Sequence, residues 1–251
     1  MKRIIVFVTD CVDVAYNELR GVVASQLQKI NSSLEVEIEP VAPVKPFSIL
    51  HGNFMLRLLA EAYPENTIFS VILNPLKDRP ARLIGTTKKK KFYFMGANTG
   101  VFEWFFRDFE IDELYELYDP GFMSFGGKYV HAPVIAQIAS GQQLNLIGRK
   151  FDTNNLTRLN VAEGTIVHVD NFGLMKFTGT LPTLKEGDKV MVEIKGKSLS
   201  AVYAHRMMSR DTGEWVVYSG SSFGLPEFGK VRQNGAKQID AEVGDSIKVI
   251  V

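Results

Sequence analysis

The chain has 251 residues, of which 45% are hydrophobic, 23% charged and 11% aromatic. This composition is typical of a globular protein and excludes a disordered chain, a collagen and a disulfide-stapled miniprotein. The 29 basic and 28 acidic residues leave a formal net charge of +1, so there is no global positive field to attract nucleic acid or an anionic membrane. We therefore expect neither nucleic acid nor a membrane as a partner.

The single cysteine, Cys11, can form no disulfide within the chain, which fits a reducing compartment. The cysteine and the four histidines do not stand at metal-ligand spacings, so we expect no metal site. The apolar run at residues 4–9 is too short for the core of a signal peptide, and no apolar run approaches the ~20 residues that cross a bilayer. We expect a soluble, cytoplasmic protein.

The first half of the chain alternates apolar strand-like runs with amphipathic helical runs. This alternation predicts an α/β domain with a central, mainly parallel sheet that helices cover on both faces. The expected strands are residues 4–9, 34–42, 67–73, 82–86 and 92–95, and the expected helices are 14–30, 52–63, 101–109 and 132–140. Asp13 is expected to be the N-cap of the first helix. The basic run 88–91 is expected to be a solvated hairpin turn.

After residue 146 the pattern changes to short strands separated by Gly-Asp, Gly-Lys and Thr-Gly turns. The expected strands include residues 164–170, 189–194, 215–219 and 246–251. Short strands at this spacing predict a small antiparallel β-barrel. We expect two domains, an α/β domain at residues 1–154 and a β-barrel domain at residues 155–251.

Ligands of open α/β sheets bind beyond the carboxyl ends of the strands, so the loops that come after strands are the candidate site. Asp10 and Asp13 come after the first strand, residues 74–78 after a central strand, and the Gly-rich run 96–100 after another. A carboxylate at a strand end can accept hydrogen bonds from a ribose diol, although Asp13 is also explained by helix capping alone. The glycine-containing loop at 121–133, before a helix, is either a place of close ligand approach or a plain turn.

Six segments of the chain carry, in order, the motifs of one known family. They are residues 9–10 (Thr-Asp), 13–21 (Asp-Val-Ala-Tyr-Asn-Glu-Leu-Arg-Gly), 46–56 (Pro-Phe-Ser-Ile-Leu-His-Gly-Asn-Phe-Met-Leu), 63–68 (Tyr-Pro-Glu-Asn-Thr-Ile), 96–101 (Gly-Ala-Asn-Thr-Gly-Val) and 170–173 (Asp-Asn-Phe-Gly). The chain thereby resembles the S-adenosylmethionine hydroxide adenosyltransferase family, or SAM hydrolases, which share their fold with the fluorinase and chlorinase enzymes. The resemblance runs through nearly the whole chain.

The resemblance implies nucleophilic displacement at the ribose C5′ of S-adenosylmethionine (SAM), which gives adenosine and L-methionine. It implies SAM as a substrate or ligand and no other cofactor, and a homotrimer whose adenosyl sites lie between one subunit's first domain and its neighbour's barrel. Ribose contacts fall on Asp10 and Asp13, and an adenosyl contact on Phe47. The methionine end falls on Asp170 and Ser222, and further substrate contacts on Phe125, Phe172 and Lys230.

The chain departs from the family where the reaction is carried out. A family Asp is Asn74 here and a family His is Gly126, while the family Arg corresponds to Arg79 or to Arg82. An amide cannot take up a proton as a base does, and glycine has no side chain, so the family's route to an activated water is missing. Leu174 also replaces an Asn that contacts adenine. We expect hydrolysis to be slow or absent.

Two features offer other chemistry. An anion needs no base to act as a nucleophile, and Lys77, near the predicted catalytic positions Asn74 and Arg82, either attracts one or is an exposed lysine. His131, five residues beyond Gly126, either acts as a base or is a packed or surface histidine. Three interpretations remain open: an enzyme that cleaves SAM with water or another anion, a non-catalytic SAM- or adenosine-binding protein, and an enzyme with a changed substrate.

Overall fold

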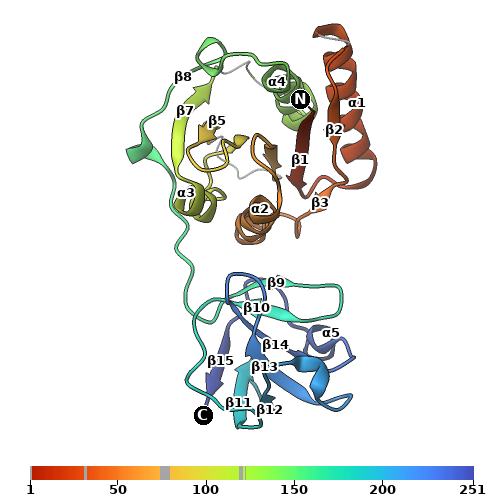
Figure 1. Cartoon of the computed structure of the whole chain (residues 1–251), viewed down its shortest axis with the longest axis vertical. Helices are drawn as coiled ribbons and strands as arrows, with labels where there is room; N and C mark the ends of the chain where they lie inside the picture. Colours follow the sequence, from red (N-terminus) through yellow and green to blue (C-terminus); the bar gives the residue numbers. More distant parts are fainter. Residues whose placement is uncertain (1, 31–32, 74–79, 119–120, 122) are drawn as a thin grey trace. The chain divides into compact units, whose positions relative to one another are not determined.

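The computed structural model describes residues 2–30, 33–73, 80–118, 121 and 123–251. The chain divides into two compact units, Met1–Leu159 and Asn160–Val251 (Figure 1). The division comes after Leu159, whereas the sequence analysis places it after residue 154. Each unit has its own sheet and its own apolar core, so we describe them separately.

The described part of the first unit is built on an eight-stranded sheet in the order β2-β1-β4-β6-β5-β7-β8, with β3 also paired to β1. β1 pairs in parallel with β2, β3 and β4, and β4 pairs in parallel with β6, whereas β5, β7 and β8 are added by antiparallel pairing. The mainly parallel sheet is thus confirmed. The strands are β1 (Arg3–Thr9), β2 (Val36–Ile38), β3 (Ala42–Pro43), β4 (Ile68–Ile72), β5 (Arg82–Thr87), β6 (Tyr93–Ala97), β7 (Ile111–Leu117) and β8 (Gly148–Lys150).

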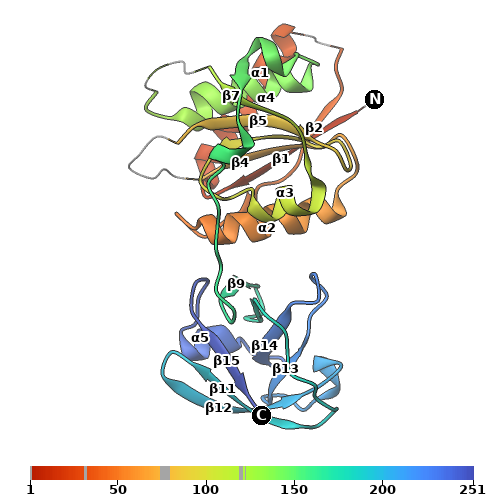
Figure 2. The ribbon, with the colours of Figure 1, turned by 90° about the vertical axis from the view of Figure 1, so that its left-hand side faces the viewer.

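Helices cover both faces of this sheet, as the alternating pattern predicts (Figure 2). α1 (Asp13–Ile30) and α4 (Ala132–Ala139) pack on one face, and α2 (Ile49–Ala62) and α3 (Glu103–Phe109) on the other. All five residues of β4 are buried, because Ile68 and Ile72 contact the first helical layer and Phe69 and Val71 the second. A strand covered on both sides is nearly continuously apolar, which explains the apolar run in the sequence, and Ser70 is the one polar residue of β4.

Several elements differ from the sequence-based expectation. The expected strand 34–42 is two short strands, β2 and β3, and β7 was not expected. α2 begins earlier than expected because the Ser48 hydroxyl accepts a hydrogen bond from the His51 backbone N–H and so caps the helix. The expected loop 121–133 is wrong in its second half, where Gly127–His131 forms a π-helix, η1, that continues into α4. Gly126 and Ala132 both have right-handed helical angles, so the glycines extend the helix here.

The second unit is a curled, mostly antiparallel seven-stranded sheet in the order β15-β11-β12-β13-β14-β10-β9, which forms a half-barrel. Only β12 and β13 pair in parallel among its described strand pairs. The turns η2 (Leu144–Leu146) and η3 (Thr153–Asn155) belong to the first unit, whereas the second unit also contains the short helical turn η4 (Met207–Ser209) and the helix α5 (Gly235–Ile239). The strands are β9 (Ile166–Val169), β10 (Met175–Phe177), β11 (Lys189–Ile194), β12 (Lys197–Tyr203), β13 (Trp215–Ser219), β14 (Pro226–Lys230) and β15 (Ile247–Ile250).

None of the helices in the described ranges combines the length and apolarity that crossing a membrane requires.

The basic run 88–91 forms the hairpin turn between β5 and β6, but it is not solvated throughout. The Lys90 ammonium donates hydrogen bonds to the carbonyl oxygens of Ala60 at 3.0 Å, Glu61 at 2.6 Å and Tyr63 at 2.9 Å. The last carbonyls of a helix have no partner within the helix and carry partial negative charge. Lys90 therefore caps the end of α2 and ties it to the hairpin.

We predict that Lys90→Met lowers the free energy of unfolding by about 1–3 kcal/mol, because it removes charge-assisted hydrogen bonds from helix-end carbonyls. Lys88→Met in the same turn is the matched control. Lys88 is exposed and lies 3.6 Å from the Glu110 carboxylate, so its replacement should change stability by no more than about 0.5 kcal/mol. Urea unfolding measures both, and equal losses would contradict the capping role of Lys90.

Candidate functional site

The strands of the first unit bring the candidate loops to one edge of the sheet. β1, β4 and β6 are linked by parallel pairing, so their carboxyl ends lie together. β5 runs against β6, with Arg82 opposite Ala97, so the start of β5 lies at the same edge. The residues just beyond β1 and β6 are therefore near Arg82, at the edge where ligands of α/β sheets bind.

Asp10 and Phe47 meet at this edge, although 37 positions separate them in the sequence. The Phe47 backbone N–H donates a hydrogen bond to Oδ2 of Asp10 at 2.9 Å. The contact forms because β3 pairs with the end of β1, with Thr9 opposite Pro43, and leads the chain back past Asp10. Phe47 has φ of 62° and its side chain is 67% exposed. An exposed aromatic ring on a strained backbone is a feature of binding sites rather than of a core.

Asp13 lies three residues beyond Asp10 and does not cap α1 as expected. It is the first residue of the helix, it is exposed, and its φ of 56° lies outside the extended region that N-cap residues adopt. Within the described residues its carboxylate makes no hydrogen bond or ion pair. Asp13 thus has no structural partner that would explain it.

Gly126 has φ of −57° and ψ of −32°, which are ordinary helical angles for any residue. A Cβ atom at Gly126 would lie 3.4 Å from Nη2 of Arg82, which is van der Waals contact. The Arg82 guanidinium therefore lies beside Gly126, the position that the resemblance matches to a histidine. A side chain at this position is compatible with the backbone.

His131, for which the sequence left open a base or a packed or surface histidine, is buried in the structure. Only 7% of the residue is exposed. Burial, and secondly the charge of Arg82, lower the pKa of its imidazole to about 3. Its Nδ1 atom has no hydrogen-bond partner among the described residues. The imidazole is uncharged at neutral pH, and a group with so low a pKa is a poor proton acceptor there.

The structure says less about the roles of the remaining predicted residues of the first unit, Phe125, Asn74 and Lys77. Phe125 is half-buried and packs against the core between the sheet and α1 and α4, so it contributes to packing. Asn74 and Lys77, two of the three predicted catalytic residues, lie outside the described residues. No group of three His, Cys, Asp or Glu side chains within the described ranges is arranged to hold a metal ion.

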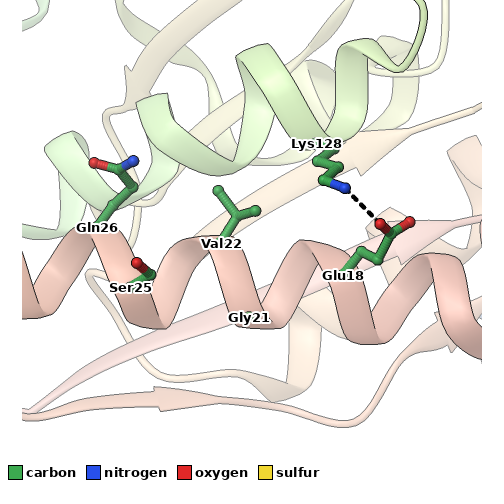
Figure 3. A pocket seen from close by; sticks show the side chains of 6 residues that line it. All are labelled: Glu18, Gly21, Val22, Ser25, Gln26 and Lys128. Atoms are coloured by element: carbon green, nitrogen blue, oxygen red, sulfur yellow. Dashed lines mark hydrogen bonds and ion pairs between the residues drawn. The ribbon is translucent and has the colours of Figure 1, made fainter.

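A pocket of about 260 Å³ lies between α1 and η1, and none of the sequence-predicted site residues lines it (Figure 3). Lys128 of η1 and Glu18 of α1 form an ion pair of 2.5 Å across it. Gly21 also lines the pocket and presents no side chain to it. The ion pair links η1 to α1, so this pocket is a seam between packed helices.

The predicted residues of the second unit lie on three loops and strand ends. Asp170 organises the turn between β9 and β10, because its Oδ1 accepts hydrogen bonds from the backbone N–H groups of Phe172 and Leu174, both at 2.9 Å. Phe172 is 68% exposed, whereas Ser222, in the loop between β13 and β14, is buried. Lys230 donates a hydrogen bond to Gln238 at 2.8 Å and lies over the Trp215 ring.

We predict opposite effects of an alanine at two neighbouring glycines, Gly126 at the N-cap of η1 and Gly127 at its first position. Gly126→Ala should leave the free energy of unfolding unchanged or raise it by about 0.5–1 kcal/mol, because the helical backbone accepts a side chain there. Gly127→Ala should lower it by about 1–3 kcal/mol, because the new Cβ would lie 3.1 Å from the Phe125 ring and 3.2 Å from Leu19. Chemical denaturation compares the stabilities of the two variants. A strongly destabilised Gly126→Ala variant would contradict the conclusion that the backbone at Gly126 accepts a side chain.

Comparison with known proteins agrees with this arrangement. The chain is 24% identical over 247 residues to the (R)-S-adenosyl-L-methionine hydrolase of Methanocaldococcus jannaschii, with 92% of this chain and 89% of the relative covered. It is similar in fold to an uncharacterized conserved protein from Thermotoga maritima, with a TM-score of 0.80 and 22% identity, and to a conserved hypothetical protein from Thermus thermophilus, with a TM-score of 0.75 and 19% identity. Both fold comparisons cover 100% of each chain.

Residues 5–148, more than half of the chain and nearly all of the first unit, match the SAM hydroxide adenosyltransferase N-terminal domain. The match includes Asp10, Asp13, Phe47 and Arg82, the residues that the fold brings to the carboxyl edge of the sheet or to the loops beside it. The chain therefore belongs to the S-adenosylmethionine hydroxide adenosyltransferase family.

Proposed function

We propose that the protein binds SAM and catalyses substitution at its ribose C5′, releasing L-methionine, with adenosine as the product when water attacks. The observation that carries this proposal is the contact between Asp10 and Phe47 at the carboxyl edge of the sheet, inside the region that matches the family domain. The contact combines a carboxylate with an exposed aromatic ring, which are the two chemistries that a ribose diol and an adenine base require. The (R)-SAM hydrolase relative supports the same substrate.

We propose that Asp10, Asp13 or both accept hydrogen bonds from the ribose hydroxyls. Asp10 uses one carboxylate oxygen for the Phe47 N–H, and each carboxylate oxygen can accept a second bond. Asp13 is exposed and makes no bond to the described residues, which leaves its carboxylate available to a ligand.

The reaction places few demands on the protein beyond the nucleophile. The nucleophile attacks C5′, the C5′–S bond breaks, and its electron pair stays on sulfur, which becomes the neutral thioether of methionine. Water must also lose a proton, and neither Gly126, which has no side chain, nor His131, whose imidazole has a pKa of about 3, provides an effective base for it. An anion needs no proton acceptor. The Arg82 guanidinium beside Gly126 supports an anion at this position, and Lys77 is a second proposed attractant.

A second candidate function is a non-catalytic SAM- or adenosine-binding protein. The burial of His131 favours it, because this histidine was the alternative base that the sequence offered, and an imidazole with a pKa of about 3 does not fill that role. Both candidates share the ligand and differ only in turnover.

We also propose a homotrimer in which the second unit of a neighbouring subunit completes each adenosyl site. Apolar side chains around the Asp10 loop support a covered surface there, since Val14 is 72% exposed, Phe47 67% and Val12 39%. Exposed apolar side chains gathered at one place commonly mark an interface or a ligand site. Light scattering of the purified protein measures the assembly.

We predict that Asp10→Ala or Asp13→Ala weakens adenosine binding about tenfold or more, because each charge-assisted hydrogen bond contributes about 1.5–3 kcal/mol. Asp112→Ala, which removes an exposed carboxylate from β7, is the matched control and should bind adenosine like the wild type. Isothermal titration calorimetry measures the three affinities. Unchanged affinity in both site variants would reject the ribose assignment.

We predict that the wild-type protein releases adenosine from SAM slowly or not at all, and that Asn74→Asp with Gly126→His accelerates release by up to about 10²–10⁴-fold, the usual contribution of a general base. Asn74→Asp with Gly126→Ala is the control that lacks the imidazole. Chromatography of adenosine, 5′-halogenated adenosine and methionine, with and without added halide, measures the products.

Each outcome of this assay separates the candidates. Halogenated adenosine would identify an anion as the nucleophile. Binding of SAM without any product would favour the non-catalytic candidate. Fast adenosine release by the wild type without added anion would show that the catalytic groups are not those assigned above.

A further inference from the structure

Four polar side chains stand in one row across the sheet of the second unit. Strand register places Lys176 of β10 opposite His168 of β9 on one side and opposite Glu227 of β14 on the other, and Glu227 opposite Tyr218 of β13. We call these four residues the polar row. Lys176 Nζ is paired with Glu227 Oε1, and the Tyr218 hydroxyl donates to Glu227 Oε2 at 2.5 Å. Glu227 is thus held from both sides.

The centre of the polar row is buried. Lys176 is 9% exposed and Glu227 3%, and the neighbouring strand residues Met175 and Phe228 point into the apolar core on the opposite face. Two charges removed from water cost more to bury than a pair of apolar side chains of similar size. Stability is therefore a weak explanation of the ion pair, and its contacts with the neighbouring loops offer a better one.

The loop between β13 and β14 lies directly on the Glu227 carboxylate. A Cβ atom at Gly220 would lie only 2.1 Å from Glu227 Oε1, so glycine is required for this close approach. The loop closes on itself through hydrogen bonds from the Gly220 N–H to Leu225 and from the Leu225 N–H to Ser222, at 2.8 and 3.0 Å. The Glu227 side chain therefore determines how closely this loop, which carries the buried Ser222, approaches the sheet.

The other end of the polar row lies near Asp170. Asp170 directly follows β9 and lies two residues beyond His168 in the sequence. The Asp170 charge contributes to raising the pKa of Tyr218, after burial and the hydrogen bond to Glu227, and it opposes the lowering of the His168 pKa by burial and Lys176. The turn of Asp170, residues 170–174, joins β9 to β10, and His168 and Lys176 are register partners two residues on either side of it, so this turn and the loop of Ser222 both adjoin the polar row.

We propose that Glu227, held by Lys176 and Tyr218, is a positioning residue that fixes the Ser222 loop and the Asp170 turn for the amino acid end of the substrate. This inference rests on the proposed function. A carboxylate such as Asp170 suits the ammonium group of that end, and a hydroxyl such as Ser222 suits its carboxylate. Both must be held at a fixed separation, and the polar row is the element that contacts or adjoins the two loops.

The test uses a double variant, Lys176→Met with Glu227→Leu. Removing one charge alone would leave the other buried and unpaired, whereas an apolar pair of similar size commonly keeps the fold. Calorimetry gives the affinities for SAM and for 5′-methylthioadenosine, which has the same adenosyl end but no amino acid. We expect SAM affinity to fall about tenfold or more and 5′-methylthioadenosine affinity to stay unchanged.

Two further variants complete the design. Arg210→Met with Glu214→Gln removes another ion pair of the same unit, one that is partly exposed and 3.0 Å long, and should leave both affinities unchanged. Tyr218→Phe deletes only the hydroxyl that holds Glu227 Oε2 and should give the same selective loss in weaker form. It serves as the test if the double variant does not fold, as shown by thermal unfolding.

Equal weakening of both ligands, or wild-type affinity for SAM in a folded double variant and in Tyr218→Phe, would overturn the positioning role. The proposed function fails differently, since the wild-type protein would then bind neither SAM nor 5′-methylthioadenosine. Selective loss of SAM affinity in the variants, with binding intact in the wild type, supports both the positioning role of Glu227 and the proposed function.

Discussion

The parallel pairing of β1 with β4 is the constraint on which the first unit depends. It runs from Ile5 opposite Ile68 to Thr9 opposite Ile72, with every paired residue buried. Because parallel strands end at the same edge, this register places the loop beyond β1 at the carboxyl ends of β4 and β6. The pairing of β3 with the last residues of β1 then returns the chain to Asp10. The candidate site is therefore a consequence of how the sheet is ordered.

Neither Gly126 nor His131 provides an effective proton acceptor at this edge of the sheet. Gly126 leaves the space beside Arg82 without a titratable group, although its helical angles would accept one. His131 is near in sequence, but desolvation keeps its imidazole uncharged. A cation beside a small residue and an uncharged histidine suits an anion better than it suits a water that must be deprotonated.

The second unit uses the two faces of one sheet differently. One face carries an apolar core that includes Ile166, Met175, Val217 and Phe228. The opposite face carries the polar row, which the loop at Gly220 covers. Alternation along short strands makes this division possible, since neighbouring residues point to opposite faces. The core maintains the half-barrel, and the polar row lies beneath the loop between β13 and β14.

The sequence by itself predicted the α/β unit, a second unit of short antiparallel strands and the resemblance to the family, because hydrophobic periodicity and ordered motifs are local properties of the chain. It also placed β1, β4 and α1 within a residue or so, since each buries a long apolar pattern. It missed η1, because helical angles at paired glycines leave no local signal. Nothing in the segments at 175–177 and 226–228 marks Lys176 and Glu227 as buried, because cross-strand register and the overlying loop bury them. Likewise, the state of His131 and the contact of Asp10 with Phe47 were decided by tertiary structure, because burial and hydrogen bonding between distant residues depend on which strands lie side by side.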